Sequence, residues 1–291
     1  MDKETRRQGD KGTRRQGDKG TRGQGDKGTR RRGDTGRESS SCTVRPTRPD
    51  DPFLLAADID GTLVGDEVGE AWLKALVRCY PGSLYLALIT GRTWQSVMGL
   101  VEGGRLPQPD YVCGSVGTEL VACHDPDNVL GLKYAAQVSA GWDIETIYAL
   151  GEGDGIRRQE FSAGQPRFQA GFDWDGQAET LAAFHSRLAN SDGYHVVASY
   201  GTYVDVLPTP LGKGNVVRFL QQELGLDPER VVVAGDSGND REMFDMGFKG
   251  IVPANALEEL KAAACRPWHY HSPLPAARGV IDGLCHFGFV K

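Results

Sequence analysis

The sequence contains no hydrophobic run near the roughly 18 residues that a membrane-spanning helix requires. Its first fifty residues also lack the apolar segment of a secretory signal. The six cysteines are scattered and form no Cys-x-x-Cys pair, so the sequence indicates neither a disulfide framework nor a zinc ribbon. From these absences we expect a soluble cytoplasmic protein without a membrane partner. The 291 residues, 39% of them hydrophobic, are enough for a sizeable core in one or two domains.

Charges of both signs are present, but they are unevenly placed along the chain. Residues 1–50 carry 15 Lys and Arg against 8 Asp and Glu, whereas the whole chain has a net charge of −6, so the remaining 241 residues carry −13. The basic part consists largely of an eight-residue polar repeat that begins at Thr5 and occurs four times, twice as TRRQGDKG and then as TRGQGDKG and TRRRGDTG. It has almost no apolar side chain before Val44, and we therefore expect residues 1–52 to form a disordered basic tail.

A basic arm that binds nucleic acid is the alternative interpretation of this tail. Acidic residues interrupt each basic cluster, and residues 1–50 contain no aromatic side chain on which a base could stack. We favour a translated repeat without function, and we expect no nucleic-acid partner.

From Phe53 onward, short apolar segments alternate with amphipathic ones. The apolar runs predict buried strands, and apolar residues spaced by three and four predict helices. The alternation indicates an α/β fold whose core is a doubly wound, mostly parallel, Rossmann-like sheet, with ligands bound at the carboxyl ends of its strands. We expect strands at residues 53–57, 84–90 and 231–234, and helices at residues 68–80, 93–102, 214–224 and 239–246.

Two pairs of acidic residues follow predicted strands. Asp58 and Asp60 come directly after the first strand, where the period of two places both side chains on the same side of the chain, and Gly61 lets the backbone turn away. Asp236 and Asp240 follow the strand 231–234 around a glycine turn. Like charges so close together are costly unless a cation or a shared proton lies between them. The pattern therefore predicts a metal site or an acid/base pair.

Groups suited to binding an anion stand beside two further elements. Thr90 and Gly91 offer a hydroxyl and a backbone N–H at the start of a predicted helix. Lys213 lies in Leu-Gly-Lys-Gly just before another predicted helix, where a loop can aim its ammonium at a phosphate. The four segments therefore supply, in chain order, an acid pair, a hydroxyl, a lysine and a second acid pair.

The spacing of these groups predicts an inserted domain. Asp58 and Thr90 are 32 residues apart, enough for one helix and one strand, whereas Thr90 and Lys213 are 123 residues apart. We expect the surplus, residues 126–206, to form a separate small α+β domain. Within it we expect helices at 139–151 and 178–189 and β-like segments at 161–172 and 194–199. Residues 53–125 and 207–291 would form the core that carries the four segments.

The four motifs resemble those of the haloacid dehalogenase-like phosphohydrolases. The segments DIDGT, ITGR, GKG and GDSGND, which contain Asp58, Thr90, Lys213 and Asp236, match the four motifs of that superfamily in order. Beyond the motifs, the chain is most similar to sucrose-phosphate phosphatases and their relatives that act on other disaccharide phosphates. The segments that carry this resemblance are LVGD from Leu63, PDY from Pro109, SVGTE from Ser115, VDVLP from Val204 and HFGF from His286.

The resemblance implies a role for each matching residue. Asp58 would attack phosphorus to form an aspartyl phosphate, and Asp60 would protonate the leaving alcohol and then activate water. Mg²⁺ would be held by the carboxylate of Asp58, the backbone carbonyl of Asp60, Asp236 and Asp240. The phosphoryl group would be bound by Thr90, the N–H of Gly91 and Lys213, with Asn239 helping to orient the site.

The resemblance also implies a substrate class. We expect a Mg²⁺-dependent phosphatase that acts on a sugar phosphate, in first place a disaccharide phosphate such as sucrose 6-phosphate. The stretch Arg167–Ala170 departs from that of the sucrose enzymes, which keeps mannosylfructose phosphate and other glycosyl-sugar phosphates as alternatives. A sugar-phosphate synthase is the protein partner that such a role suggests. The resemblance implies that residues 126–206 are a cap that covers the catalytic pocket. The cap residues that we expect to contact the sugar are Gln159, Glu160, Arg167 and Gln169.

Two other functions are compatible with the same residues. A phosphotransferase or phosphomutase would form the same aspartyl phosphate but return the phosphoryl group to a sugar. A binding protein tethered through its basic tail, with a vestigial site, is the non-enzymatic alternative, and the complete set of acids argues against it.

Overall fold

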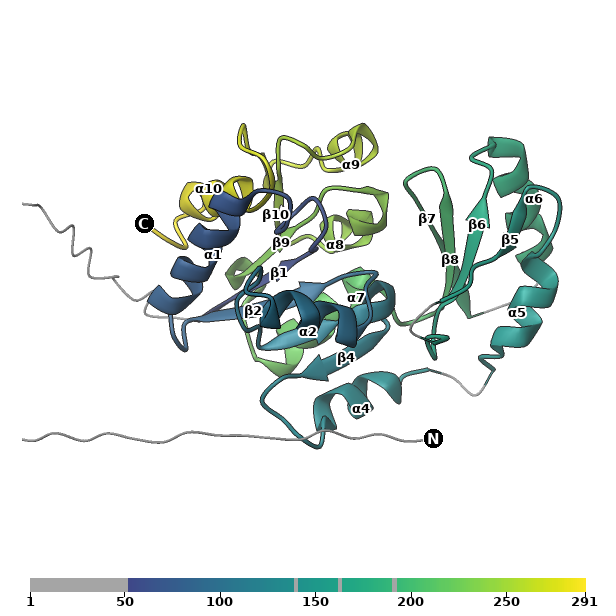
Figure 1. Ribbon diagram of the computed structural model, residues 1–291, viewed down its shortest axis with the longest axis horizontal. Helices are drawn as coiled ribbons and strands as arrows, with labels where there is room; N and C mark the ends of the chain where they lie inside the picture. The colour runs from purple at the N-terminus through teal and green to yellow at the C-terminus, as the bar shows by residue number, and fades with distance from the viewer. Residues whose placement is uncertain (1–51, 139–140, 162–163, 190–192) are drawn as a thin grey trace, which may run out of the picture. The chain divides into compact units, whose positions relative to one another are not determined.

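The computed structural model describes residues 52–138, 141–161, 164–189 and 193–291. All of them belong to one compact unit, Arg45–Lys291. The tail expected at residues 1–52 lies outside the described residues, apart from its last residue. Figure 1 shows that the described residues form two β-sheets with flanking helices. No helix in this part of the chain is long and apolar enough to cross a membrane.

The larger sheet has seven strands in the order β11-β10-β9-β1-β2-β3-β4. Its neighbouring strands run parallel, except for the antiparallel pair β3 and β4. Strand β1 (Phe53–Ala57) is fully buried, as expected for a strand that is covered on both faces. The remaining strands are Leu84–Ile89 (β2), Tyr111–Cys113 (β3), Glu119–Ala122 (β4), Val231–Ala234 (β9), Lys249–Val252 (β10) and His269–His271 (β11).

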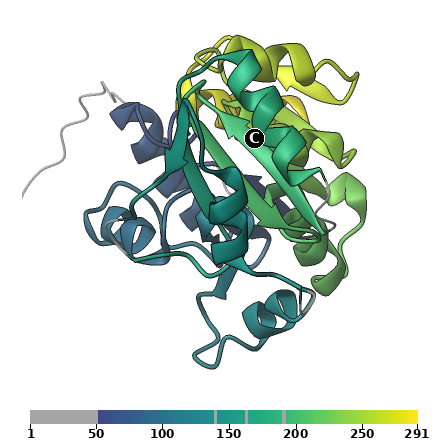
Figure 2. The ribbon, with the colours of Figure 1, turned by 90° about the vertical axis from the view of Figure 1, so that its right-hand side faces the viewer.

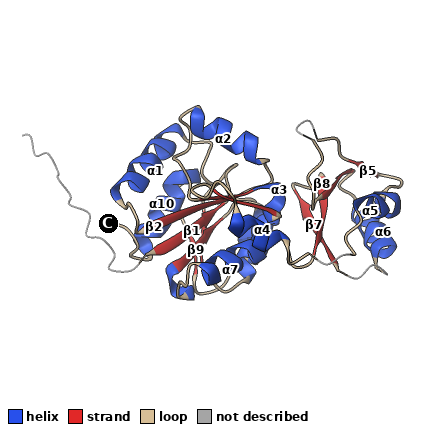
Figure 3. Cartoon of the chain, turned by 90° about the horizontal axis from the view of Figure 1, so that it is seen from below, coloured by secondary structure: helices blue, strands red, loops and turns tan. Residues whose placement is uncertain are grey.

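Helices cover both faces of this sheet, as Figure 3 shows. Leu73 of α1 and Leu284 of α10 pack into the core on one face, and Tyr134 of α4 and Val217 of α7 pack into the core on the other. The arrangement confirms the predicted doubly wound α/β fold. The elements are Glu67–Cys79 (α1), Trp94–Glu102 (α2), Gly114–Gly117 (α3), Val129–Ala135 (α4), Lys213–Glu223 (α7), Arg241–Asp245 (α8), Glu258–Ala263 (α9), Ala276–His286 (α10) and the 3₁₀ turns Pro228–Arg230 (η1) and Gly238–Asp240 (η2).

The smaller sheet is antiparallel, with four strands in the order β5-β6-β8-β7. Two helices, α5 and α6, lie across one of its faces (Figure 2). Their side chains Ile147 and Phe184 pack with Phe172 and Val204 of the strands in a separate apolar core. The elements are Ile144–Gly151 (α5), Ile156–Arg158 (β5), Ala170–Trp174 (β6), Ala178–Leu188 (α6), Tyr194–Ser199 (β7) and Tyr203–Pro208 (β8).

The largest difference from the predicted elements is at residues 161–172, expected to be β-like. The strand there begins only at Ala170, because Gly164 has a φ of +92° and Pro166 has no N–H for a ladder hydrogen bond. Strand β5, just before this segment, was not predicted, since its three residues are too few to show an alternation.

Two helices also begin differently from the prediction. The helix expected at 139–151 begins at Ile144, where the Asp143 side chain caps it by accepting the N–H of Glu145 at 3.2 Å. The helix expected at 239–246 begins as the 3₁₀ turn η2, since Ser237 and Asp240 form a capping box there. Helix α4 lies inside the range expected for the cap, yet it packs against β4 of the larger sheet.

Candidate active site

The first acid motif leaves β1 at the carboxyl end of the strand. Asp58 is buried, and its N–H donates to the carbonyl of Ala234 in β9 at 3.0 Å. The chain then turns at Gly61, where φ is +77° and where a Cβ atom would overlap the Asp236 carboxylate. Thr62 Oγ1 donates to Asp236 Oδ1 at 3.3 Å. This turn therefore brings the two acid motifs into contact.

The side chain of Lys213 contacts both acid motifs. Lys213 is the first residue of α7 and is completely buried. Its Nζ donates to Asp58 Oδ1 at 2.8 Å, to Asp240 Oδ1 at 2.6 Å and to Asn239 Oδ1 at 2.9 Å. All three hydrogens of the ammonium thus have acceptors, which fixes the position of the charge.

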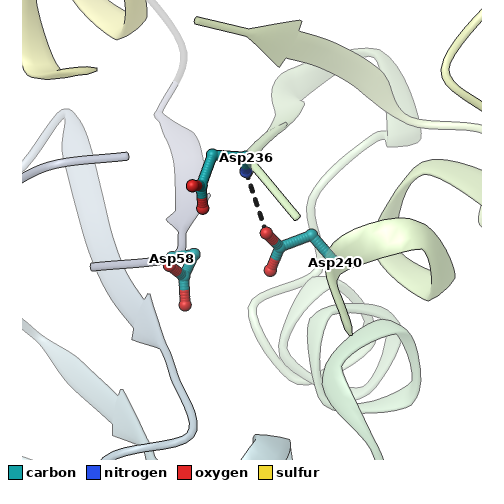
Figure 4. Close-up of side chains that lie close together, drawn as sticks. All are labelled: Asp58, Asp236 and Asp240. Carbon is teal, nitrogen blue, oxygen red and sulfur yellow. Dashed lines mark hydrogen bonds between the residues drawn. The ribbon is translucent and has the colours of Figure 1, made fainter. Parts of the chain in front are cut away.

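The second acid motif forms a tight loop after β9. Asp240 Oδ2 accepts the backbone N–H of Asp236 at 2.9 Å and that of Ser237 at 3.1 Å, so its carboxylate is held by its own loop. Figure 4 shows the side chains of Asp58, Asp236 and Asp240 lying close together. One carboxylate oxygen from each of them lies within 4.8 Å of the others.

Burial shifts the protonation equilibria of these groups. It raises the pKa of Asp58 to about 8, although the charge of Lys213 opposes the shift. It also raises the pKa of Asp236 to about 7, and the charge of Asp240 adds to that shift. Burial alone would lower the pKa of Lys213, but the charges of Asp240 and Asp58 hold it above its usual value.

The acid cluster fits a hard divalent cation. Three carboxylates converge on one point, and a single ammonium offsets their charge only in part. Their donor atoms are oxygens, which Mg²⁺ prefers over nitrogen and sulfur. The excess negative charge and the oxygen donors together make these residues suited to hold Mg²⁺.

Asp60, the second acid of the first motif, points away from this cluster. Its carboxylate accepts two hydrogen bonds from Arg92, from Nε at 2.6 Å and from Nη2 at 2.7 Å. Arg92 is positioned in turn by a hydrogen bond to Ser96 Oγ at 2.9 Å. About half of the Asp60 side chain is exposed, so this carboxylate can reach a ligand from the open side.

A strained turn closes the site beside Thr90. Ser115 and Val116 have φ values of 50° and 58°, a left-handed backbone that costs a residue other than glycine about 1–3 kcal/mol. Two backbone hydrogen bonds of 3.0 Å hold the turn, from Ser115 N–H to Arg92 O and from Val116 N–H to Thr90 O. The buried Thr90 hydroxyl is thereby kept next to Gly91 at the open end of β2.

A cavity of about 410 Å³ opens over these groups. It is lined by residues that belong to both sheets and their connections, so the two parts of the fold share one site. The lining consists of Asp58, Asp60, Thr90, Gly91, Arg92, Val116 and Asn239 on the side of the larger sheet, and of Gln159, Phe161, Gln169, Ser199, Tyr200, Tyr203 and Asp205 on the side of the smaller sheet.

The structure brings most of the predicted site residues together. The two glutamines expected in the cap, Gln159 and Gln169, line the cavity. Glu160 instead lines a neighbouring hollow. Arg167 is also outside the cavity lining, with its N–H donating to Glu119 Oε1 at 3.3 Å and its guanidinium over the ring of Phe168.

Several lining residues were not predicted from the sequence. Tyr203 and Asp205 alternate with buried valines along β8, and Tyr200 lies at the turn between β7 and β8. Tyr200 has a φ of 54°, and burial raises the pKa of its hydroxyl to about 12. The alternation of polar and apolar residues along β8 is the sequence signal for Tyr203 and Asp205. It identifies them only when it is known which face of the sheet the helices cover.

Known proteins are similar to this chain along most of its described length. The model of the sucrose-6F-phosphate phosphohydrolase family matches residues 51–288. Mannosylfructose-phosphate phosphatase of Agrobacterium fabrum is 33% identical over 246 residues, which cover 81% of this chain and 96% of that protein. Glucosylglycerol-phosphate synthase of Pseudomonas anguilliseptica is 31% identical over 240 residues, which cover 82% of this chain and 31% of that protein. The chain therefore spans about a third of the length of this second relative.

A solved structure gives the same result for the fold. The sucrose-phosphatase from Synechocystis sp. PCC6803, in complex with sucrose and phosphate, has a TM-score of 0.75 and 28% sequence identity to this chain. The match covers 81% of this chain and 98% of that one. The similarity therefore extends over both sheets.

Proposed function

Because the chain belongs to the sucrose-6F-phosphate phosphohydrolase family, we propose that it is a Mg²⁺-dependent phosphatase that hydrolyses a disaccharide phosphate through an aspartyl phosphate. Membership of the family makes it a phosphoric monoester hydrolase of the haloacid dehalogenase superfamily. The observation that carries the finer proposal is the buried contact between Lys213 Nζ and Asp58 Oδ1, at 2.8 Å beside the cavity. Phosphoryl transfer depends mainly on positioning and charge neutralisation, and this contact supports both.

Asp58 is the proposed nucleophile. Its Oδ1 accepts a hydrogen bond from Lys213, which leaves Oδ2 to attack phosphorus. The new bond between Oδ2 and phosphorus forms as the bond between phosphorus and the leaving oxygen breaks. Thr90 Oγ1 and the N–H of Gly91, both at the cavity wall, bind the oxygens of the phosphoryl group, and Asn239 helps to hold Lys213 in place.

Asp60 is the proposed proton carrier. It donates a proton to the leaving oxygen of the sugar and then accepts a proton from the water that attacks the aspartyl phosphate. Its position in the cavity lining supports this role. Arg92 occupies both carboxylate oxygens of Asp60, so this contact has to open before Asp60 can reach the leaving oxygen.

The residues that would hold Mg²⁺ are Asp58, the backbone carbonyl of Asp60 and Asp236, with Asp240 beside them. When bound, the cation neutralises part of the negative charge on the phosphoryl oxygens. The convergence of the three carboxylates supports this assignment.

Of residues 126–206, the part that runs from α5 to β8 and forms the smaller sheet is the proposed substrate-specificity cap, since α4 packs against the larger sheet. The motif residues engage only the phosphoryl group, so recognition of the sugar falls to the cap side of the cavity. A volume of about 410 Å³ lies in the range of sites for small organic ligands and exceeds what a phosphate alone requires. We rank sucrose 6-phosphate first and mannosylfructose phosphate second, as the names of the family and of the Agrobacterium relative suggest.

A phosphate-release screen tests the proposal. Purified protein with Mg²⁺ is assayed on sucrose 6-phosphate, mannosylfructose phosphate, glucose 6-phosphate and nucleotides, and we expect the highest kcat/KM for a disaccharide phosphate. Higher values for nucleotides or monosaccharide phosphates would exclude the disaccharide assignment. An isomerised sugar phosphate in place of free phosphate would identify a phosphomutase.

Two variants complete the screen. Asp58→Asn should fold and lose phosphatase activity, because an amide is a poor nucleophile. Asp173→Asn is the matched control, since Asp173 is a partly exposed carboxylate of β6 that is outside the cavity lining. Activity of Asp58→Asn within tenfold of the unchanged protein would exclude Asp58 as the nucleophile.

A further inference from the structure

Lys213 stands between two glycines that lie very close to helix α8. A Cβ atom at Gly212 would lie 2.6 Å from Glu242 Oε2, and one at Gly214 would lie 2.6 Å from the backbone oxygen of Glu242. Gly212 also has a φ of +133°, which residues with a side chain rarely adopt. The two glycines therefore let α8 approach the start of α7 more closely than any side chain would allow.

Glu242, the second residue of α8, holds the first turn of α7 at this approach. Its Oε2 accepts the backbone N–H of Gly214 at 3.1 Å, and its Oε1 accepts Nδ2 of Asn215 at 2.8 Å. The N–H groups of a first helical turn have no partner within the helix, and a negative charge is favoured beside them. Both carboxylate oxygens thus fix the helix start whose first residue is Lys213.

Tyr134 of α4 holds the other glycine. The residue is 1% exposed, and its hydroxyl accepts the N–H of Gly212 at 3.3 Å and donates to Gly117 O at 3.0 Å. Gly117 is the last residue of the strained turn beside Thr90, and a Cβ atom there would lie 2.7 Å from the N and Cα atoms of Lys213. The turn that keeps Thr90 in place is therefore packed directly against the backbone of Lys213.

Tyr134 and Glu242 do not touch the space in which the substrate would bind. Both are outside the lining of the catalytic cavity, and Glu242 lines a separate cavity of about 600 Å³. A shift of the start of α7 would nevertheless move the Lys213 ammonium, which lies 2.8 Å from Asp58 Oδ1. A misplacement of about 1 Å at a reacting centre can cost about 100-fold in rate. Residues that hold this helix start therefore bear on the chemistry from outside the cavity.

We propose that Glu242 and Tyr134 are positioning residues, which clamp the two glycines beside Lys213 and so set the place of its ammonium against Asp58 and the phosphoryl group. This inference rests on the proposed phosphatase activity and extends it from the groups that touch the phosphoryl group to those that hold them. Helix α8 contributes a carboxylate to the clamp and α4 a phenol, and the glycines leave room for both.

The first test compares two substrates in the variants Glu242→Ala and Tyr134→Phe. Lys213 acts on the phosphoryl group that all substrates share, so kcat should fall by the same factor for sucrose 6-phosphate and for p-nitrophenyl phosphate. We expect a fall of about 10- to 100-fold in Glu242→Ala. In Tyr134→Phe, which loses only a hydroxyl, we expect about 3- to 10-fold.

Two matched controls separate positioning from stability. Asp110→Ala removes a carboxylate that accepts the backbone N–H of Leu86 at 2.8 Å, and Tyr270→Phe removes a hydroxyl that donates to Asp282 Oδ2 at 2.9 Å. Asp110 and Tyr270 are outside the cavity lining, so these variants should lower Tm but keep kcat within about twofold. If the clamp variants also lowered only Tm, their role would be structural and the inference would be overturned.

A second test asks whether the effect passes through the lysine. In a Lys213→Met background, Glu242→Ala should change kcat for p-nitrophenyl phosphate by less than about twofold, because the group that Glu242 positions is already absent. A thermal scan confirms that each variant is folded. A fall by the same factor in both backgrounds would show that Glu242 acts independently of Lys213, which contradicts the clamp.

A third test requires neither activity nor substrate. The Lys213 ammonium is fully buried, so in protein made with ¹⁵N-labelled lysine its NMR signal should exchange slowly with water and stand apart from the signals of exposed lysines. The signal should shift or broaden in Glu242→Ala and Tyr134→Phe and stay in place in Asp110→Ala and Tyr270→Phe. An unchanged signal in the clamp variants would overturn the inference. If the unchanged protein releases phosphate from no ester, the proposed function fails, and this signal still decides whether the clamp holds the lysine.

Discussion

Lys213 is the residue whose surroundings constrain the chemistry most, because its ammonium is fully buried between two carboxylates. A buried ion pair is weak evidence of net stabilisation, yet removal of one partner leaves the other charge buried and unpaired. Without the ammonium, the carboxylates of Asp58 and Asp240 would face each other. The lysine is therefore a counter-ion of the fold as well as a candidate phosphate ligand.

This position gives the first prediction. Lys213→Met should lower the free energy of unfolding by about 3–5 kcal/mol in the absence of metal, because it leaves buried acids without a cation. Urea denaturation at pH 7.5 measures the change. Lys133→Met is the control, since it breaks an exposed pair with Glu223 and should cost less than about 1 kcal/mol. Equal losses in the two variants would contradict the counter-ion role.

A second prediction concerns the proton that Asp60 supplies. Asp60→Asn keeps the shape of the side chain but removes the acid, so kcat should fall by about 100-fold or more for a sugar phosphate. The fall should be much smaller for p-nitrophenyl phosphate, whose leaving group is stable as an anion. Steady-state kinetics on both substrates, with a thermal scan to confirm folding, measure the difference. A uniform loss would argue against an acid role for Asp60.

At the scale of elements, the phosphate side of the site was predictable because its signals are local. Strand β1 is a continuous apolar run, Asp58 and Asp60 follow it at a period of two, and Gly61 provides the turn. Helix α7 was expected at residues 214–224 and is found at Lys213–Glu223 for the same reason. Neither prediction requires knowledge of contacts between distant parts of the chain.

The side of the cavity formed by the smaller sheet could not be predicted in this way. Asp205 stands between the buried residues Val204 and Val206, and its orientation depends on which face α5 and α6 cover, which is a tertiary fact. Glu160 was expected in the pocket as an acidic side chain of the cap, and Arg167 as the start of the stretch Arg167–Ala170 that departs from the sucrose enzymes. The break at Gly164 and Pro166 places this segment differently, with Arg167 beside Glu119.

The turn after β1 gives a prediction at this scale. Gly61→Ala would force a Cβ atom into the Asp236 carboxylate, at a position where φ is +77°. The variant should therefore be less stable, and its kcat should fall by more than tenfold. Gly82→Ala is the matched control, because Gly82 has a similar φ of +71° but no atom near the position of an added Cβ. That variant should lose only about 1–2 kcal/mol of stability, the cost of the left-handed backbone, and keep its activity. Comparable kcat values in the two variants would show that the overlap with Asp236 does not cause the loss of activity.

At the scale of the whole molecule, the acid cluster couples stability to pH and Mg²⁺. Burial, reinforced by the charge of Asp240, raises the pKa of Asp236 from 3.8 to about 7. Between about pH 4 and 7 the folded protein therefore holds a proton that the unfolded chain releases. The contribution of this group to stability is fully present below that window and is lost as the pH rises through it.

The corresponding prediction is a pH-dependent effect of Mg²⁺. The cation requires deprotonated carboxylates, so 10-fold dilution or removal of Mg²⁺ should lower Tm more at pH 8 than at pH 6. Differential scanning calorimetry at both pH values, with and without Mg²⁺, measures the effect. In Asp236→Asn the dependence should largely disappear. The same Mg²⁺-induced shift at both pH values would contradict the assignment.

The central position of β1 also has a consequence for synthesis of the chain. Its two neighbours come from distant parts of the sequence, since Leu54 pairs with Tyr85 on one side and with Val231 on the other. At about 5–20 residues per second, the ribosome needs roughly 10 to 35 seconds to add the residues that separate Leu54 from Val231, and during that time one edge of an apolar strand is open. The strands of the smaller sheet all lie between Ile156 and Pro208, so that sheet is complete before β9 is made. The nascent chain thus contains every strand of the smaller sheet before the larger sheet can be completed, and the edge of β1 that pairs with β9 stays open until then.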